Sequence, residues 1–382
     1  MTFRGLLGVL RKSIGRGRIG AREAGLMDFG RWALFSPRVD LGVFLGSALL
    51  SLLALGVGHQ LGYLHSDSPE WTWVVAVLLV DVAHVWSTGF RIYFEPLELR
   101  RRPGLYLGTP LLCWLAGVLL YLQGAGLFWR ALAYLAVWHF VRQQYGWVAL
   151  YRARNQDPGG WHRLLDSLTI YLCTLYPLLY WHCHLPRNFW WFLPQDFAAV
   201  GFDLSAWVAP LYWTCLALYG VRALLAYLGH SGRPSPGKDM VVLTTWACWY
   251  LGIVVLNSDY AFTVTNVLIH GVPYMALVYY YRGSSERRPS PPWWVFLVTL
   301  WALAYCEELL WDRAIWHERA WLFGAPWGLD GWHSLLVPLL ATPQITHYVL
   351  DGFIWKRRQA PGLFSGGSIA EASADAGGPA PA

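Results

Sequence analysis

Long apolar blocks separated by short polar connections run through most of the 382-residue sequence. A helix needs about 20 mainly apolar residues to cross the hydrocarbon core of a bilayer. Only 14% of the residues are charged, whereas soluble domains average about 25%. The sequence therefore predicts an all-α, polytopic integral membrane bundle of about ten transmembrane helices. The predicted spans are 41–62, 71–92, 105–123, 125–150, 164–181, 205–228, 240–257, 260–281, 293–311 and 333–355.

Basic residues lie in alternate connections between these blocks. Arg100, Arg101 and Arg102 follow the second predicted span, and further basic groups follow the fourth, sixth, eighth and tenth. Since cytoplasmic loops of membrane proteins are enriched in Lys and Arg, we expect both termini on the cytoplasmic side. A multi-pass protein of the bacterial inner membrane fits this pattern. The net charge of +6 then reflects topology, and we expect no binding to nucleic acid.

The chain divides into one large domain and two terminal segments. Residues 1–40 are basic but lack the sustained apolar core of a signal peptide, so we expect a cytoplasmic segment. Residues 41–358 form the predicted transmembrane domain. Residues 359–382 are rich in Gly, Ala, Ser and Pro, which predicts a disordered tail. The six cysteines include no CxxC pair, so neither a disulfide framework nor a structural zinc site is indicated.

Four of the predicted spans carry a histidine deep inside the apolar block, with a polar residue about one helical turn away. Ionisable side chains inside a bilayer are costly and usually mark function. Spacings of three or four residues place both members of a pair on the same helix face. The pairs are Asp81 and His84, His139 and Gln143, Asn266 and His270, and His347 and Asp351.

The four histidines also share a depth. At a rise of about 1.5 Å per residue, they lie roughly 12–20 Å from the cytoplasmic ends of their spans. They therefore fall in one slab roughly 8 Å thick, and this depth permits a single cluster. The sequence does not say whether the four helices are neighbours.

Histidine combined with carboxylate suggests a metal site. Imidazole is a ligand for iron, copper and zinc, and carboxylates extend the preference toward iron or manganese. Helical bundles also build di-metal sites from inward Glu and Glu-x-x-His pairs. We therefore predict an iron site, mononuclear or di-iron. The predicted ligands are His84, His139, His270 and His347, joined by Asp81 and Asp351 as further ligands or as acceptors that orient the histidines. Gln143 and Asn266 are predicted supporting donors or weak ligands, and Arg142 and Tyr145 are candidates for a gate or a substrate-headgroup site.

The stretches DVAH, WHFVRQQYG, NVLIHG and THYVLDG resemble, in their arrangement, the histidine-containing integral-membrane iron oxygenases. That class includes fatty-acid desaturases and hydroxylases, and the Brp/Blh-type carotenoid-cleaving proteins. The HxxxH and HxxHH boxes of desaturase-like enzymes do not occur in this sequence, and no single family is assigned. The resemblance implies an iron-dependent oxidation of a hydrophobic substrate from the lipid bilayer, with a redox partner that the sequence does not identify.

Three other hypotheses fit the same residues. Two of the histidines on facing helices could hold a b-type haem as axial ligands. Asp81 or Asp351 could instead bind a proton or cation in a transporter. The polar pairs could also be hydrogen bonds that join helices without any chemistry.

Overall fold

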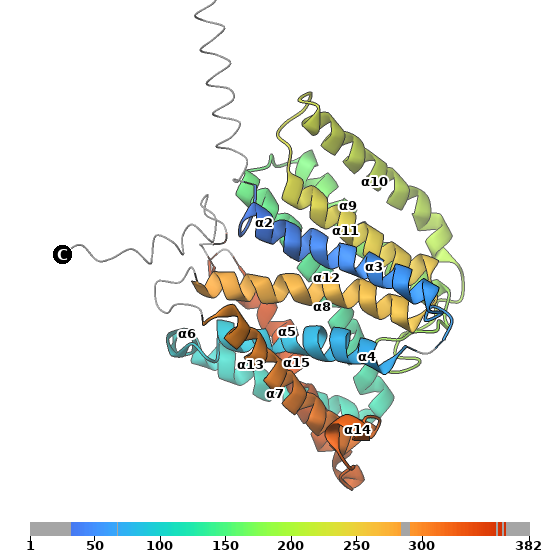
Figure 1. Cartoon of the computed structure of the whole chain (residues 1–382), viewed down its shortest axis with the longest axis vertical. Helices are drawn as coiled ribbons and strands as arrows, with labels where there is room; N and C mark the ends of the chain where they lie inside the picture. The colour runs from blue at the N-terminus through green and yellow to red at the C-terminus, as the bar shows by residue number, and fades with distance from the viewer. Residues whose placement is uncertain (1–31, 67, 284–290, 357, 361–362, 364–382) are drawn as a thin grey trace, which may run out of the picture.

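The chain is seen in a computed structural model that describes residues 32–66, 68–283, 291–356, 358–360 and 363. Most of the predicted basic segment and of the predicted tail lies outside the described residues. Within the described part, every regular element is helical. The helices are α2 (Pro37–Asp40), α3 (Gly46–Gln60), α4 (Glu70–Thr72), α5 (Ala83–Arg91), α6 (Pro96–Arg101), α7 (Pro103–Gln123), α8 (Ala125–Asn155), α9 (Trp161–Cys183), α10 (Leu204–Tyr227), α11 (Pro236–Trp249), α12 (Asp259–Gly283), α13 (Trp293–Trp311), α14 (Ala320–Phe323) and α15 (His333–Ile354) (Figure 1).

Several of these helices continue through π-helical stretches, in which each backbone N–H donates a hydrogen bond to the carbonyl five residues earlier. Leu41–Leu45 joins α2 to α3, and Trp73–Val82 joins α4 to α5. Tyr250–Val255 extends α11, and Asp312–Trp316 extends α13. π-helical turns occur frequently at functional sites, and the second of these stretches contains Asp81.

Seven helices in the described part are long and apolar enough to cross a membrane, so the protein is a membrane-type helical bundle. Each of the ten predicted ranges contains a helix, but α8, α9 and α15 are less apolar than the other seven. These three have 31, 23 and 22 residues, which is at least about 33 Å each. Two of them, α8 and α15, carry the polar pairs at His139 and His347. The seven spans are Pro37–Gln60, Glu70–Arg91, Pro103–Gln123, Leu204–Tyr227, Pro236–Val255, Asp259–Arg282 and Trp293–Trp316.

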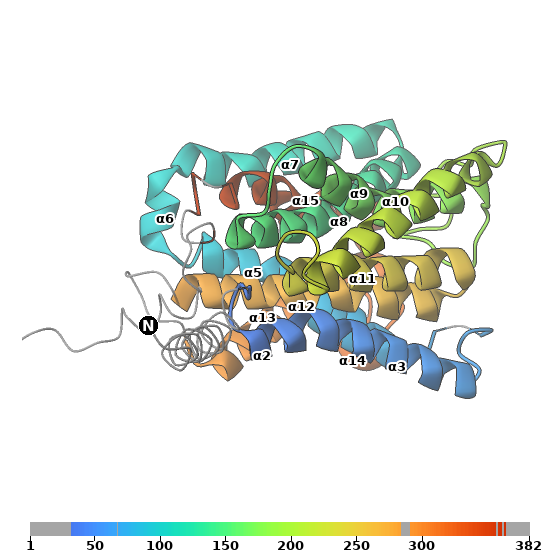
Figure 2. The same cartoon turned by 90° about the horizontal axis from the view of Figure 1, so that it is seen from above.

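Helix α12 is the centre of the bundle. In its most apolar window 83% of the residues are buried, against 17–50% in the other six spans. It packs against α3, the Glu70–Arg91 helix, α8 and α11, and it runs through the middle of the molecule in both views (Figures 1 and 2). The helix with the most buried surroundings is therefore one of those that carry a predicted ligand, His270.

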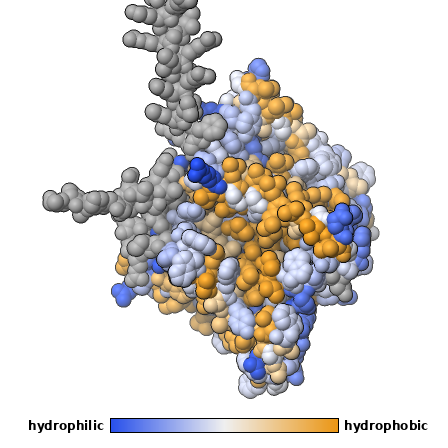
Figure 3. Space-filling view, viewed as in Figure 1, coloured by the Kyte–Doolittle hydropathy of each residue, from blue (hydrophilic) through white to orange (hydrophobic). Residues whose placement is uncertain are grey.

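Peripheral helices of the bundle expose large apolar side chains. Figure 3 shows a broad hydrophobic area over one face. Contiguous exposed apolar surface of this kind marks contact with a membrane or a partner, and its position on long helices fits contact with lipid. Exposed side chains on three peripheral helices are Leu49 and Leu53 of α3, Leu111, Leu112, Leu119 and Leu122 of α7, and Trp207 and Leu218 of α10.

Candidate metal centre

The four predicted histidines lie in one cluster. Helices α5, α8, α12 and α15 carry them, and α5 and α8 each contact both α12 and α15. Neighbouring ring centroids are 4.6 Å apart for His84 and His270, 5.1 Å for His270 and His139, 4.6 Å for His139 and His347, and 5.0 Å for His347 and His84. The four rings thus form a closed circuit of neighbours, which we call the histidine square. At 0–6% relative exposure, all four residues are buried.

The Nε2 atoms of these rings face one another in pairs. His84 Nε2 and His270 Nε2 are 3.1 Å apart, and His347 Nε2 and His139 Nε2 are 3.2 Å apart. Imidazole nitrogens bind a metal such as zinc at about 2.0–2.1 Å, so adjacent ligand atoms lie about 3 Å apart. One ligand atom each from His84, His139 and His270 lies within 4.8 Å of the other two. The cluster can therefore hold a metal ion.

The two aspartates lie on the opposite, Nδ1 side of the rings. Asp81 Oδ1 is 3.5 Å from His84 Nδ1. Asp351 is 3.8 Å from His347 Nδ1 and 3.9 Å from His139 Nδ1. Distances of 3.5–3.9 Å are too long for hydrogen bonds, so each carboxylate lies beside its ring without fixing the tautomer. Asp351 also groups with His139 and His347 closely enough to share an ion with them.

A second polar layer lies one helical turn from the histidines. Tyr274 OH donates a hydrogen bond of 2.5 Å to Asp351 Oδ1, and Trp355 Nε1 donates one of 3.3 Å to the same oxygen. Thr88 Oγ1 is 2.8 Å from His347 Nδ1 and 3.3 Å from Tyr274 OH. Thr88, Tyr274 and Trp355 are not among the site residues predicted from the sequence. A signal was present, because Thr88, Gln143, Tyr274 and Asp351 each follow a cluster histidine by four residues.

The two predicted amides have different surroundings. Gln143 Nε2 donates a 2.8 Å hydrogen bond to the backbone carbonyl of His270 and so ties α8 to α12 at the cluster. Asn266 Nδ2 donates to Phe262 O within its own helix, at 2.9 Å. Its Oδ1 is buried and has no hydrogen-bond partner among the described residues. Gln143 therefore supports the cluster directly, whereas Asn266 does not hydrogen-bond to a cluster histidine.

Several buried polar atoms of the cluster also lack a hydrogen bond. Within the described part of the chain, these include His84 Nδ1, His270 Nδ1 and Asp81 Oδ1. Leaving a buried polar group unpaired costs about 1–3 kcal/mol, and such groups concentrate where a structure serves a function. The unpaired nitrogens are Nδ1 atoms, on the side of each ring away from the paired Nε2 atoms.

A close helix contact holds His84 beside His270. A Cβ atom built on Gly271 of α12 would lie 2.7 Å from Val80 Cγ1 and 3.0 Å from the Val80 carbonyl oxygen. Val80 belongs to the π-helical stretch before α5. Only glycine allows two backbones to approach this closely. Gly271 therefore lets the two helices come into contact, and this contact places His84 beside His270.

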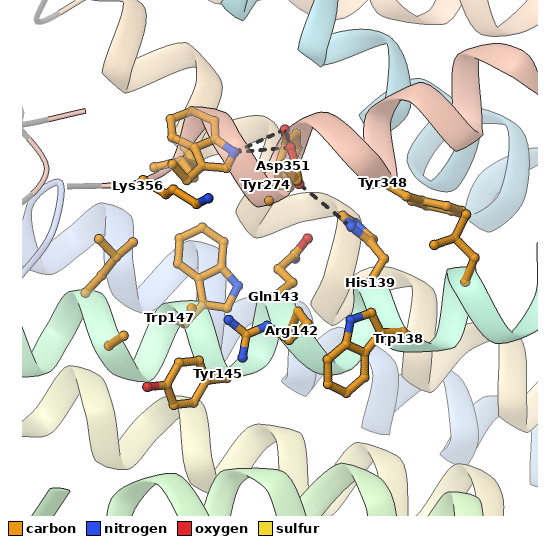
Figure 4. A pocket seen from close by; sticks show the side chains of 17 residues that line it. Trp138, His139, Arg142, Gln143, Tyr145, Trp147, Tyr274, Tyr348, Asp351 and Lys356 are labelled. Atoms are coloured by element: carbon orange, nitrogen blue, oxygen red, sulfur yellow. Dashed lines mark hydrogen bonds and ion pairs between the residues drawn. The ribbon is translucent and has the colours of Figure 1, made fainter. Parts of the chain in front are cut away.

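A first cavity, of about 370 Å³, reaches the cluster between α8 and α15. His139 and Asp351 line it, and so do the predicted gate residues Arg142 and Tyr145. In Figure 4, Arg142, Gln143 and Trp147 of α8 lie opposite Asp351 and Lys356. Arg142 donates a hydrogen bond to Tyr171 OH, and its guanidinium lies 5.0 Å from the centre of the Tyr145 ring. Arg142 and Tyr145 therefore belong to the wall of this α8–α15 cavity rather than to the histidine square.

A second cavity, of about 480 Å³, lies toward the other end of these helices and is lined by Asp81, which lies beside His84. On α12 its lining ends at Val267, and the α8–α15 cavity is lined by Tyr274, so His270 lies between the two. On α15, Gln344 lines the second cavity and Tyr348 the first, with His347 between them. On α12 and α15 the histidines therefore lie between the two cavities.

Comparisons with protein-family models, with curated proteins and with solved structures find no match for this chain. The site must therefore be interpreted from its geometry.

Proposed function

We propose that this membrane protein is a metal-dependent oxygenase, desaturase or hydroxylase, with iron bound by His84, His139, His270 and His347. The supporting observation is the square of four buried imidazoles from four helices, with Nε2 atoms paired at 3.1 and 3.2 Å. Imidazole combined with carboxylate suits iron. The resemblance of the four histidine stretches to membrane iron oxygenases supports the same assignment.

The chain's own residues would hold and shield such a centre. When bound, iron supplies one-electron and dioxygen chemistry, with electrons from a redox partner. Thr88 Oγ1 is 2.8 Å from His347 Nδ1 and orients that ring, and Tyr274 and Trp355 hold Asp351 beside the cluster through hydrogen bonds to Oδ1. These contacts fix the ligand geometry before an ion arrives, which lowers the cost of binding.

The substrate would be a hydrophobic molecule from the bilayer, bound in the α8–α15 cavity. Its volume of about 370 Å³ falls in the usual range of small-molecule sites, about 300–1,000 Å³. Apolar side chains such as Leu135, Leu277 and Trp147 line it, and it reaches His139 at the cluster. Arg142 and Lys356 in the same wall would contact a polar end of the substrate.

Metal analysis of the purified protein tests the proposal. In lipid nanodiscs, we expect about one or two iron ions per chain, and loss of the metal in His139→Ala and His347→Ala. The control is His317→Ala, because His317 is exposed and far from the cluster in the sequence. A wild-type protein without stoichiometric metal would refute the proposal, and a Soret absorption band would replace it with a haem protein. Oxidised products in lipid extracts incubated with the loaded protein would identify the substrate.

We also infer that α8, α9 and α15 cross the bilayer, which gives ten spans with both termini in the cytoplasm of a bacterial inner membrane. Their lengths and the alternation of basic loops support this topology. Reporter fusions test it. A cytoplasmic reporter is expected to be active after residue 158 or 232 and inactive after residue 195 or 325. Activity on the same side at 158 and 195 would exclude α9 as a span.

The two cavities support a second candidate, a transporter with an intramembrane cation or proton site. On α12 and α15 they lie on opposite sides of the histidines, as the two halves of an alternating-access pathway would. Uptake of metal ions into proteoliposomes that Asp351→Asn abolishes would favour transport. Metal retention without uptake would favour the enzyme.

A further inference from the structure

The second cavity is strongly acidic. Of its lining residues only Arg319 is basic, and Arg319 is already paired with Glu70 at 3.2 Å and with Glu318 at 3.0 Å. Its acidic lining residues are Asp81, Asp259, Glu307, Glu308 and Glu318. We call it the acidic cavity. Charges of one sign in a cleft with apolar walls concentrate ions of the opposite sign.

The inner end of the acidic cavity holds the groups nearest the cluster. Asp81 lines the cavity and also lies 3.5 Å from His84 Nδ1. Glu307 and Glu308 of α13 line the same cavity as Asp81. Carboxylates that share an apolar site repel one another unless a proton or a cation lies between them.

An unpaired amide oxygen at the same end points independently to a ligand. Asn266 is 2% exposed and lines the acidic cavity, and its Oδ1 has no hydrogen-bond partner in the described part of the chain. Side-chain amide oxygens are common ligands of hard divalent cations. By contrast, Glu307 Oε2 accepts a 2.6 Å hydrogen bond from Trp86 Nε1, which fixes that carboxylate in place.

From these contacts we infer that the acidic cavity is a divalent-cation site that delivers the metal ion to the histidines, from the end opposite the α8–α15 cavity. Asp81, Glu307, Glu308 and Asn266 line it with oxygen atoms that attract a hydrated cation without forming a preformed ligand group in the described part of the chain. Oxygen ligands hold a hydrated divalent cation loosely, whereas imidazoles bind first-row transition metals more strongly. The ion therefore moves from oxygen to nitrogen ligands, and Asp81 is the residue shared by both sites. This inference rests on the proposed metal centre but not on the reaction that the centre performs.

The test measures how fast the metal-free protein takes up Co²⁺, whose visible absorption reports binding to the histidines. In nanodiscs at low salt, we expect the second-order loading rate to fall at least tenfold in Glu307→Gln/Glu308→Gln, on the order of an electrostatic focusing effect. The final amount of histidine-bound cobalt should not change. Asp330→Asn is the matched control, because Asp330 is exposed and does not line the cavity.

A second variant keeps the test valid if the double substitution does not fold. Thr263→Lys adds a positive charge to the cavity wall and leaves every carboxylate in place, and we expect the same slowing. The difference from wild type should shrink as salt rises to about 1 M, where screening acts within about 3 Å. Wild-type loading rates in both variants would overturn the inference and leave the histidine centre standing. If wild-type protein shows no cobalt absorption at all, the metal centre itself fails.

Discussion

Gly271 lies in direct contact with Val80, close enough that any side chain at 271 would overlap Val80 Cγ1 and approach its carbonyl oxygen. We predict that Gly271→Ala pushes α12 away from the Glu70–Arg91 helix and separates His270 from His84. Overpacking of this kind costs about 1–3 kcal/mol. Thermal unfolding in detergent and metal titration should both show the loss.

Gly56→Ala is the matched control for that variant. Gly56 also lies in a helix, but no atom lies within 4 Å of a Cβ built there. Alanine is favoured over glycine in helices by about 1 kcal/mol, so stability should hold or rise. Equal effects at the two positions would mean that the contact with Val80 does not position the histidines.

Thr88→Val should weaken metal binding and leave the fold intact. The substitution removes the Oγ1 atom that lies 2.8 Å from His347 Nδ1 and keeps a β-branched side chain of similar shape. Groups that orient metal-binding histidines are worth about 10–100-fold in affinity, and we expect about tenfold here, measured by competition with a chelator. Thr109→Val is the control, because Thr109 Oγ1 bonds only to Leu105 O of its own helix among the described contacts.

Removal of the metal should destabilise the protein. A ligand at 100 times its dissociation constant stabilises the folded state by about 2.7 kcal/mol. The melting temperature should therefore fall on treatment with a chelator and recover when the metal is restored. The His84→Ala variant should have the same melting temperature with the chelator and with the metal restored. A chelator response that survives in His84→Ala would place the bound metal elsewhere.

Gly117→Val should loosen the contact between α7 and α15. A Cβ atom at Gly117 would lie 2.9 Å from Pro338 Cβ, so the larger side chain forces the two helices apart at a cost of about 1–3 kcal/mol. Gly108→Val on the same helix is the control, because a Cβ there meets nothing within 4 Å. Since α15 carries His347, metal affinity should fall with stability in Gly117→Val alone.

The polar pairs inside apolar blocks predicted which histidines to examine, because an ionisable side chain in a membrane span stands out against its surroundings. Thr88 and Tyr274 were not predicted, because threonine and tyrosine are unremarkable in such spans. Their roles depend on partners in other helices, His347 and Asp351. The i+4 spacing places them on the correct face but does not identify the partner.

The sequence also did not predict which helices contact one another. Periodicity predicts where a helix lies in the sequence, but the shape of its surface decides which helices it packs against. Gly271 and Val80 are an example, because glycine permits a close contact that a hydropathy pattern does not reveal. The number of transmembrane helices is hard to predict for a related reason. Buried polar residues lower the hydropathy of α8 and α15, so the helices that build part of the site look least like membrane spans.

The four imidazoles come from helices spread along most of the chain, from α5 to α15. During synthesis from the N-terminus, three of them emerge before His347 on α15, the last helix described. The square cannot close until that helix has been inserted and packed. Metal loading would thus mark the completion of biogenesis. A chain truncated before α15 would lack His347, and its three remaining cluster histidines would be open to quality-control proteases.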